Sequence, residues 1–218
     1  AVEQGVAASI RGGVVAVGDI AGALGFSAAS ALGDSEMGGI SFIEVFGIGR
    51  RTKNGLDGVQ RVREFARERP DRPGFAVGIQ PHAPYSCGVA VYEAAAASGL
   101  AVSTHLAETP EEAEFTRFGR GPFLDLLREV GSMAAGDAPE PSGSHPVDAL
   151  LEISPVRSWL LAHLNYPTEP DESELAYEAR LRGLAERHAT VVFCPRASAF
   201  LGHPRAGRPN HQWREFLE

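Results

Sequence analysis

The chain has 218 residues and a formal net charge of −8 at pH 7, and 44% of its residues are hydrophobic. This length and apolar content allow one domain with a sizeable core, and no apolar run is long enough to span a membrane. The negative charge argues against a nucleic-acid partner, because phosphate binding requires clustered Lys and Arg. Cys87 and Cys194 form no Cys-x-x-Cys pair, and reduced thiols fit a cytoplasmic protein.

Short apolar runs bounded by turn residues alternate with segments of helical spacing. We expect six strands, at residues 12–20, 40–46, 75–80, 100–104, 158–162 and 190–194. We expect helices at residues 1–11, within 21–37, and at 54–69, 89–98, 147–153, 172–188 and 212–218. A further helix should start after Thr109, with Pro110 at its first position and acids near its positive end.

This alternation predicts a parallel α/β sheet with right-handed crossovers. Six strands could complete an open doubly wound sheet, or they could be part of a closed eight-stranded barrel. Periodicity alone does not decide between the two. The segment 131–146 is rich in Gly, Pro, Ser and Ala and predicts an exposed loop insertion.

Three histidines follow apolar runs that we interpret as strands. They are His82, His105 and His163, and Glu108 lies three residues after His105. A neutral imidazole at a strand end can bind zinc or iron, and a nearby carboxylate can move a proton. For an isolated His-x-x-Glu, a histidine bonded to a backbone carbonyl and a solvated acid would be the simpler interpretation. Two such histidines on successive strands favour a shared crevice instead, as at the carboxyl end of an α/β barrel.

Other polar residues give weaker signals. Two prolines make the turn after residue 80 rigid and aim His82 and Tyr85 in fixed directions. Arg196 and His203 follow the sixth strand, and we count them with His82 and Tyr85 as candidate substrate-binding residues. The remaining histidines and the acids within strand runs are expected to have structural or surface positions: His145 in the flexible loop, His188 at a helix end, His211 on the surface, and Asp19 and Glu44 lining the interior or paired with arginine.

Four motifs in order, PHAPYS at 81–86, STHLAET at 103–109, LLAH at 160–163 and VFCP at 192–195, resemble the amidohydrolase superfamily. The resemblance is greatest to the branch of cytosine, S-adenosylhomocysteine and aminofutalosine deaminases and triazine hydrolases. It implies a (β/α)8 TIM barrel with one divalent metal ion, zinc or alternatively iron. It further implies that His105 binds the metal, that Glu108 shuttles the proton, and that His163 orients or polarises the attacking water. By the same resemblance His82 contacts substrate.

The sequence departs from that family in three places. The stretch after the sixth strand reads Cys-Pro-Arg-Ala-Ser where the family has Cys-Pro-x-Ser-Asn. The strand-one His-x-His pair and the strand-eight Asp are absent. We therefore expect residues 1–218 to be a partial barrel, strands two to seven, truncated at both ends. Such a chain, with one family metal ligand, should bind metal poorly.

The resemblance implies a metal-dependent hydrolase that deaminates an aminated heterocycle, so the expected partner is a small molecule, and a homo-oligomer is left open. An alternative is a non-catalytic barrel that lacks a competent metal site. A third interpretation, an open sheet that binds a phosphorylated ligand, is disfavoured because no Gly-rich strand-to-helix loop forms a phosphate site.

Overall fold

The computed structural model describes residues 2–69, 72–140, 143–153, 158–205 and 211–217. Within these residues six strands form one sheet, and each neighbouring pair is parallel. The strands are β1 (Ala16–Ala23), β2 (Gly38–Val45), β3 (Phe75–Pro81), β4 (Ala101–Leu106), β5 (Leu160–His163) and β6 (Thr190–Val192). Their order across the sheet is their order in the sequence.

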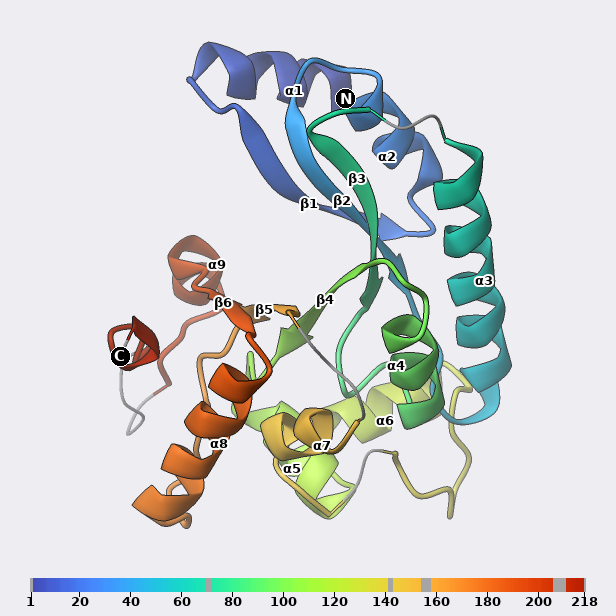
Figure 1. The fold of residues 1–218 in the computed structure, drawn as a ribbon. Helices are drawn as coiled ribbons and strands as arrows, with labels where there is room; N and C mark the ends of the chain where they lie inside the picture. Colours follow the sequence, from blue (N-terminus) through green and yellow to red (C-terminus); the bar gives the residue numbers. More distant parts are fainter. Residues whose placement is uncertain (1, 70–71, 141–142, 154–157, 206–210, 218) are drawn as a thin grey trace.

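This strand order decides between the two architectures that periodicity left open. A doubly wound sheet reverses its strand order at a switch point. Here each strand adds to the same edge as its predecessor, and the sheet curls between its two halves (Figure 1). The doubly wound alternative is therefore wrong for the described strands. The sheet has the topology of a partial (β/α) barrel.

Helices alternate with these strands along the chain. They are α1 (Val2–Arg11), α2 (Phe26–Gly33), α3 (Thr52–Glu68), α4 (Val89–Ala96), α5 (Pro110–Phe118), α6 (Pro122–Glu129), α7 (Pro146–Glu152), α8 (Glu174–Glu186) and α9 (Pro195–Phe200), with 3-10 turns η1 (Gly49–Arg51) and η2 (Glu215–Leu217). Figure 1 shows α3 beside the β1–β3 half and α5, α7 and α8 on the side of β4–β6. A helix with the length and apolar character needed to cross a membrane does not occur among the described residues.

The main core lies between the sheet and these helices. Ile43 of β2, Ile79 of β3 and Leu161 of β5 are each 0% exposed, and Val62 of α3 packs in the same cluster. Burying an aliphatic side chain of this size contributes about 1.5–3 kcal/mol. Alternate strand residues face the other way, toward the inner face of the curl. That inner face carries the polar residues described below.

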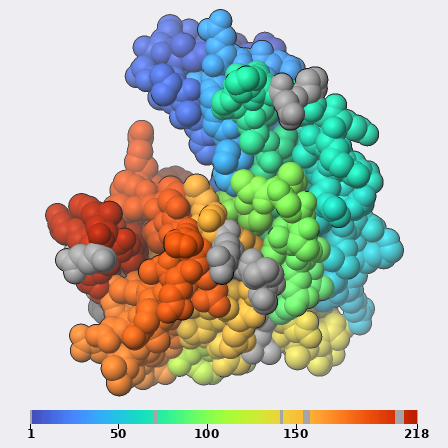
Figure 2. Space-filling model, viewed as in Figure 1, coloured from blue at the N-terminus to red at the C-terminus, as the bar shows by residue number. Residues whose placement is uncertain are grey.

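Helix α3 approaches the β2–α3 turn closely, and Gly55 makes this possible. A Cβ atom at Gly55 would lie 2.7 Å from Val91 Cγ2 and 3.0 Å from Gly47 Cα. Figure 2 shows the molecule from the same side as Figure 1, and its surface is hollowed between the N-terminal elements in blue and the C-terminal elements in orange.

The predicted elements are present with shifted boundaries. Strand β1 begins at Ala16 rather than at residue 12, because the preceding glycines form a turn after α1. Two short helices, α6 and α9, were not predicted, although each begins with a proline at its first turn. The helix expected at 212–218 is a 3-10 turn over Glu215–Leu217 in the described part of the chain.

The segment 131–146 has no helix or strand before Pro146 among its described residues, but it is only partly exposed. Met133 is 3% exposed and packs with Ile48 and Phe115 in a second apolar cluster. His145, expected in a flexible loop, is 1% exposed. Its Nδ1 accepts the Val147 N–H at 3.2 Å, and its Nε2 lies 3.2 Å from the Tyr166 carbonyl. The expectation for His145 is therefore wrong, since this ring caps α7.

Candidate functional site

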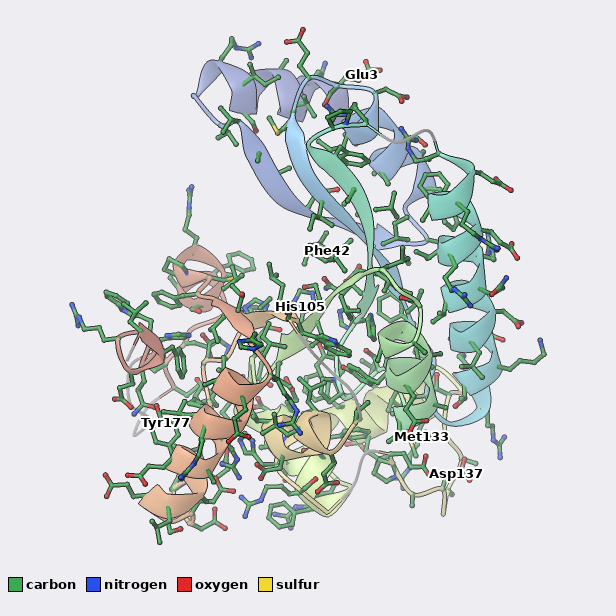
Figure 3. The ribbon with its side chains drawn as sticks, in the orientation of Figure 1. Glu3, Phe42, His105, Met133, Asp137 and Tyr177 are labelled. Atoms are coloured by element: carbon green, nitrogen blue, oxygen red, sulfur yellow. The ribbon has the colours of Figure 1, made fainter. Side chains whose placement is uncertain are left out.

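His105 lies at the carboxyl end of β4, on the inner face of the sheet. Figure 3 shows it near the middle of the molecule, where strands from both halves of the sheet meet. Its backbone N–H donates to the His82 carbonyl at 2.9 Å, which ties the ends of β3 and β4 together. Its Nε2 lies 3.0 Å from Nε2 of Gln80, which is fully buried in β3. The imidazole is thus fixed by two neighbouring strands.

His163 is the last residue of β5 and contacts both His105 and Glu108. Its Nε2 lies 3.1 Å from His105 Nδ1 and 3.3 Å from Glu108 Oε1. Burial first, and then the neighbouring histidines, lower the pKa of His163 to about 4. The ring is therefore neutral near pH 7. Burial also raises the pKa of Glu108 above its ordinary value, whereas His105 acts to lower it.

His82 and Tyr85 follow β3 and form the next part of the same crevice. The His82 ring meets the His105 ring edge-on, with centroids 5.1 Å apart, and it stacks on Phe46 at 4.6 Å. Its Nδ1 lies 2.7 Å from Ser86 Oγ. Burial first, and then His105, lowers the pKa of His82 to about 4, while Glu44 opposes this shift. The structure therefore brings His82, His105, Glu108 and His163 together.

Tyr85 lies between the histidines and an apolar cavity. Its ring meets the His82 ring edge-on at 5.6 Å and stacks flat on Phe123 at 3.8 Å. Burial raises the pKa of Tyr85, and nearby acids raise it further, so the phenol stays neutral. The cavity has a volume of about 400 Å³, and its lining includes Phe46, Arg51, Asn54, His82, Tyr85 and Phe123.

Glu44 joins this site, although its sequence position indicated a structural role. It lies on β2 in register with Gln80, and its side chain is on the inner face. Glu44 Oε1 lies 3.6 Å from His105 Nε2 and 3.9 Å from His82 Nε2. Of the two alternatives expected for Glu44, the position lining the interior is the one observed, and among the described residues it forms no ion pair with arginine. A period-two signal was present, because Glu44 stands between the core residues Ile43 and Val45 and must face the opposite side.

Glu44, His82 and His105 supply a donor set that fits a divalent metal ion. Their ligand atoms all lie within 4.8 Å of one another. Zinc binds imidazole nitrogen and carboxylate oxygen at about 2.0–2.2 Å, so two ligand atoms of a tetrahedral site are about 3.3 Å apart. The two measured separations from Glu44 are close to that spacing. Catalytic zinc sites commonly use three such ligands and keep a fourth position open.

Arg196 and His203 lie apart from the contacts just described. Arg196, on α9, is exposed and makes no ion pair within the described residues. His203 Nδ1 lies 2.6 Å from Tyr166 Oη. Its ring lines a separate cavity of about 230 Å³, together with Asn165, Pro195, Ser198 and His211. Neither side chain contacts His105 or Glu108 through a described hydrogen bond.

His211, expected on the surface, is half-buried and belongs to the surroundings of the site. Its Nε2 donates to the His163 carbonyl at 2.7 Å, and its ring stacks on Phe193 at 4.1 Å. The expectation of a surface position is therefore wrong. No local pattern could have found this contact, because it joins residues 48 positions apart.

Comparison with known proteins gives partial matches. No family model matches the chain. An aminodeoxyfutalosine deaminase of Deinococcus radiodurans is 30% identical over 143 residues, which are 61% of this chain and 32% of that protein. A 5-methylthioadenosine/S-adenosylhomocysteine deaminase of Aquifex aeolicus is 29% identical over 158 residues, which are 70% of this chain and 30% of that protein. The chain thus spans about a third of the length of these relatives.

Solved structures share the fold. Helicobacter pylori aminofutalosine deaminase matches with a TM-score of 0.69 at 20% identity, over 89% of this chain and 46% of that chain. A triazine hydrolase variant matches with a TM-score of 0.68 at 15% identity, over 99% of this chain and 45% of that chain. An adenosine deaminase from Xanthomonas campestris with bound zinc matches with a TM-score of 0.61 at 18% identity, over 88% of this chain and 38% of that chain.

Proposed function

We propose that the chain is part of an amidohydrolase-superfamily protein and that the whole protein is a metal-dependent hydrolase of non-peptide C–N bonds. Its reaction would remove the amino group of an aminated nitrogen heterocycle. One observation carries the proposal: His105, His163 and Glu108 form a connected group at the carboxyl ends of β4 and β5. The names of the two relatives, both deaminases, support the reaction type.

We further infer that β1 to β6 are strands two to seven of a closed eight-stranded barrel. Support comes from the sequential strand order and from the 45–46% of the neighbouring chains that this chain covers. Coding sequence on either side of the present chain should then encode a His-x-His after one strand and an Asp after another. Open reading frame without either would instead favour the non-catalytic alternative.

The residues present fit a zinc or iron ion, and Glu44, His82 and His105 would hold it. When bound, such an ion supplies Lewis acidity and makes water a nucleophile near neutral pH. The sequence indicated His105 as one ligand; the geometry adds Glu44 and His82 as donors, so His82 can serve the metal as well as the substrate. Tyr85 and the aromatic cavity beside it would hold the flat substrate ring.

Glu108 and His163 would move and stabilise charge next to that ring. The buried Glu108 carboxyl, whose pKa is raised, suits an acid that takes a proton and returns it to the leaving amine. In the tautomer that carries its proton on Nε2, His163 can donate that N–H to a Glu108 carboxylate oxygen 3.3 Å away. The neutral His163 ring can offer the same N–H to oxygen charge that develops on the substrate. Arg196 and His203 are proposed to contact more distant parts of the substrate.

Ammonia release from aminated purines, pterins and triazines by the full-length protein would test this function. Glu108→Gln should keep the metal and cut turnover about 10²–10⁴-fold, which is the usual value of general acid–base catalysis. His105→Ala should lose metal as well as activity. Glu114→Gln, at a partly exposed ion-pair residue of α5, is the matched control and should leave both unchanged. An unchanged rate in Glu108→Gln with intact metal would refute the mechanism.

A further inference from the structure

The turn between β4 and α5 carries Glu108, and hydrogen bonds hold its backbone from both sides. Glu112 Oε1 accepts the Ala107 N–H at 2.8 Å, and Glu112 Oε2 accepts the Glu108 N–H at 3.1 Å. From the other side, Tyr166 N–H donates to the Ala107 carbonyl at 3.0 Å, and Asn165 Nδ2 donates to the Glu108 carbonyl at 3.1 Å. Every backbone polar group of these two turn residues is therefore bonded, which leaves the Glu108 side chain available for chemistry.

Glu112 is unusual because its carboxyl is 0% exposed. Burying an acid is unfavourable unless its oxygens are hydrogen-bonded, and here both oxygens are used by the turn. Burial raises the pKa of Glu112, whereas the two backbone N–H groups favour the ionised form and act to lower it. The metal donor set and the proton-transfer pair do not include this residue. The buried carboxyl of Glu112 therefore has the turn before α5 as its hydrogen-bonding partner.

The contacts of Glu112 also differ from those of an ordinary helix cap. In a capping box, the N-cap hydroxyl bonds to the first turn, and an acid three residues on bonds back to the N-cap N–H. Thr109, the N-cap of α5, makes no side-chain cap bond. Glu112 instead reaches past it to Ala107, whose φ of +48° is rare for a residue with a side chain. The carboxyl thus stabilises a turn that the local sequence would not otherwise favour.

We infer that Glu112 is a positioning residue for Glu108, which fixes the turn so that Glu108 Oε1 stays 3.3 Å from His163 Nε2. This role rests on the proposed function, in which Glu108 moves the proton. If one acceptor is lost, a buried N–H is left unpaired and the turn must shift to relieve it. A misplacement of about 1 Å at a reacting group can lower the rate about 10²-fold.

Glu112→Gln tests the role, because it replaces one accepting oxygen with an N–H donor that faces a backbone N–H. In the metal-loaded full-length enzyme we expect kcat to fall about 10–100-fold, with KM and metal content unchanged. In a Glu108→Gln background the same substitution should have no further effect on kcat, because it acts through Glu108. Additive losses in the double variant would overturn the role and leave Glu112 as structural support.

Amide hydrogen exchange separates this role from the proposed function, because it needs no substrate. Glu112→Gln should accelerate exchange at Ala107 and Glu108 and leave the amides of β4 unchanged, whereas the control Glu114→Gln should change neither. Unaltered exchange at both turn amides would overturn the role even in an active enzyme. Accelerated exchange in a protein without deaminase activity would reject the proposed function alone. If the amide variant does not fold, Glu112→Asp, which draws the oxygens back by one methylene, repeats both measurements.

Discussion

Arg180 of α8 joins three segments of the chain, and Arg180→Met should destabilise the fold strongly. The guanidinium bonds to Asp148 at 2.8 and 2.6 Å, to Glu172 at 2.6 and 2.6 Å, and to the Pro167 carbonyl at 3.1 Å. Its side chain is 3% exposed. Removing one partner of a buried ion pair costs about 3–5 kcal/mol. Because water can reach Asp148, which is 37% exposed, we expect about 3 kcal/mol at pH 7.

The pH dependence of that loss identifies its cause. Burial alone would raise the pKa of Glu172, but hydrogen bonds from Arg180 outweigh it and lower the pKa from 4.5 to about 2. Glu172 therefore contributes stability above pH 4.5, and this contribution is lost as the pH falls toward 2. Urea unfolding followed by circular dichroism should show a larger difference between wild type and Arg180→Met at pH 7 than at pH 3.

Arg182→Met provides the matched control, because Arg182 lies on the same helix and is exposed. It should change the free energy of unfolding by less than about 0.5 kcal/mol. A loss below about 1 kcal/mol for Arg180→Met at pH 7, or an equal loss at pH 3, would refute the reasoning.

Three further outcomes can be measured. Glu44→Gln should weaken zinc binding by at least about tenfold in a chelator competition assay, if Glu44 is a ligand beside His105. Between pH 6.5 and 4 the free energy of unfolding should fall less in His145→Gln than in the wild type. Burial lowers the pKa of His145 to about 4, so in that range the unfolded chain binds a proton that the folded protein does not. Leu161→Ala, at a site 0% exposed, should cost about 2–5 kcal/mol in urea unfolding.

The strand ends and their histidines could be predicted because both signals are local. A short apolar run before His105 or His163 indicates a buried strand, and parallel strands bring their carboxyl ends to one edge of the sheet. The same reasoning missed Glu44. Its contact with His105 depends on the register of β2 against β3 and β4, which pairing between distant residues determines and which no local pattern contains.

The contact of Glu112 with the preceding turn could not be predicted for a related reason. An acid in the first turn of a helix usually interacts with the helix end, and the sequence at Thr109 matched that pattern. The alternative, a bond to the turn that precedes the helix, becomes favourable only because Asn165 and Tyr166 hold the opposite side of that turn. Those two residues lie more than fifty positions away in the sequence.

Hydrogen bonds between distant residues also explain why the end of β5 tolerates an unfavourable backbone conformation. His163 and Leu164 both have positive φ, at 76° and 49°, a conformation that costs about 1 kcal/mol or more for each residue with a side chain. Leu164 N–H donates to the Leu106 carbonyl at 2.9 Å, and His211 bonds the His163 carbonyl. These bonds hold the chain where it turns sharply after β5. The turn leaves the His163 ring on the inner face beside His105 and Glu108, so the local strain is retained at the position where the proposed chemistry requires a fixed imidazole.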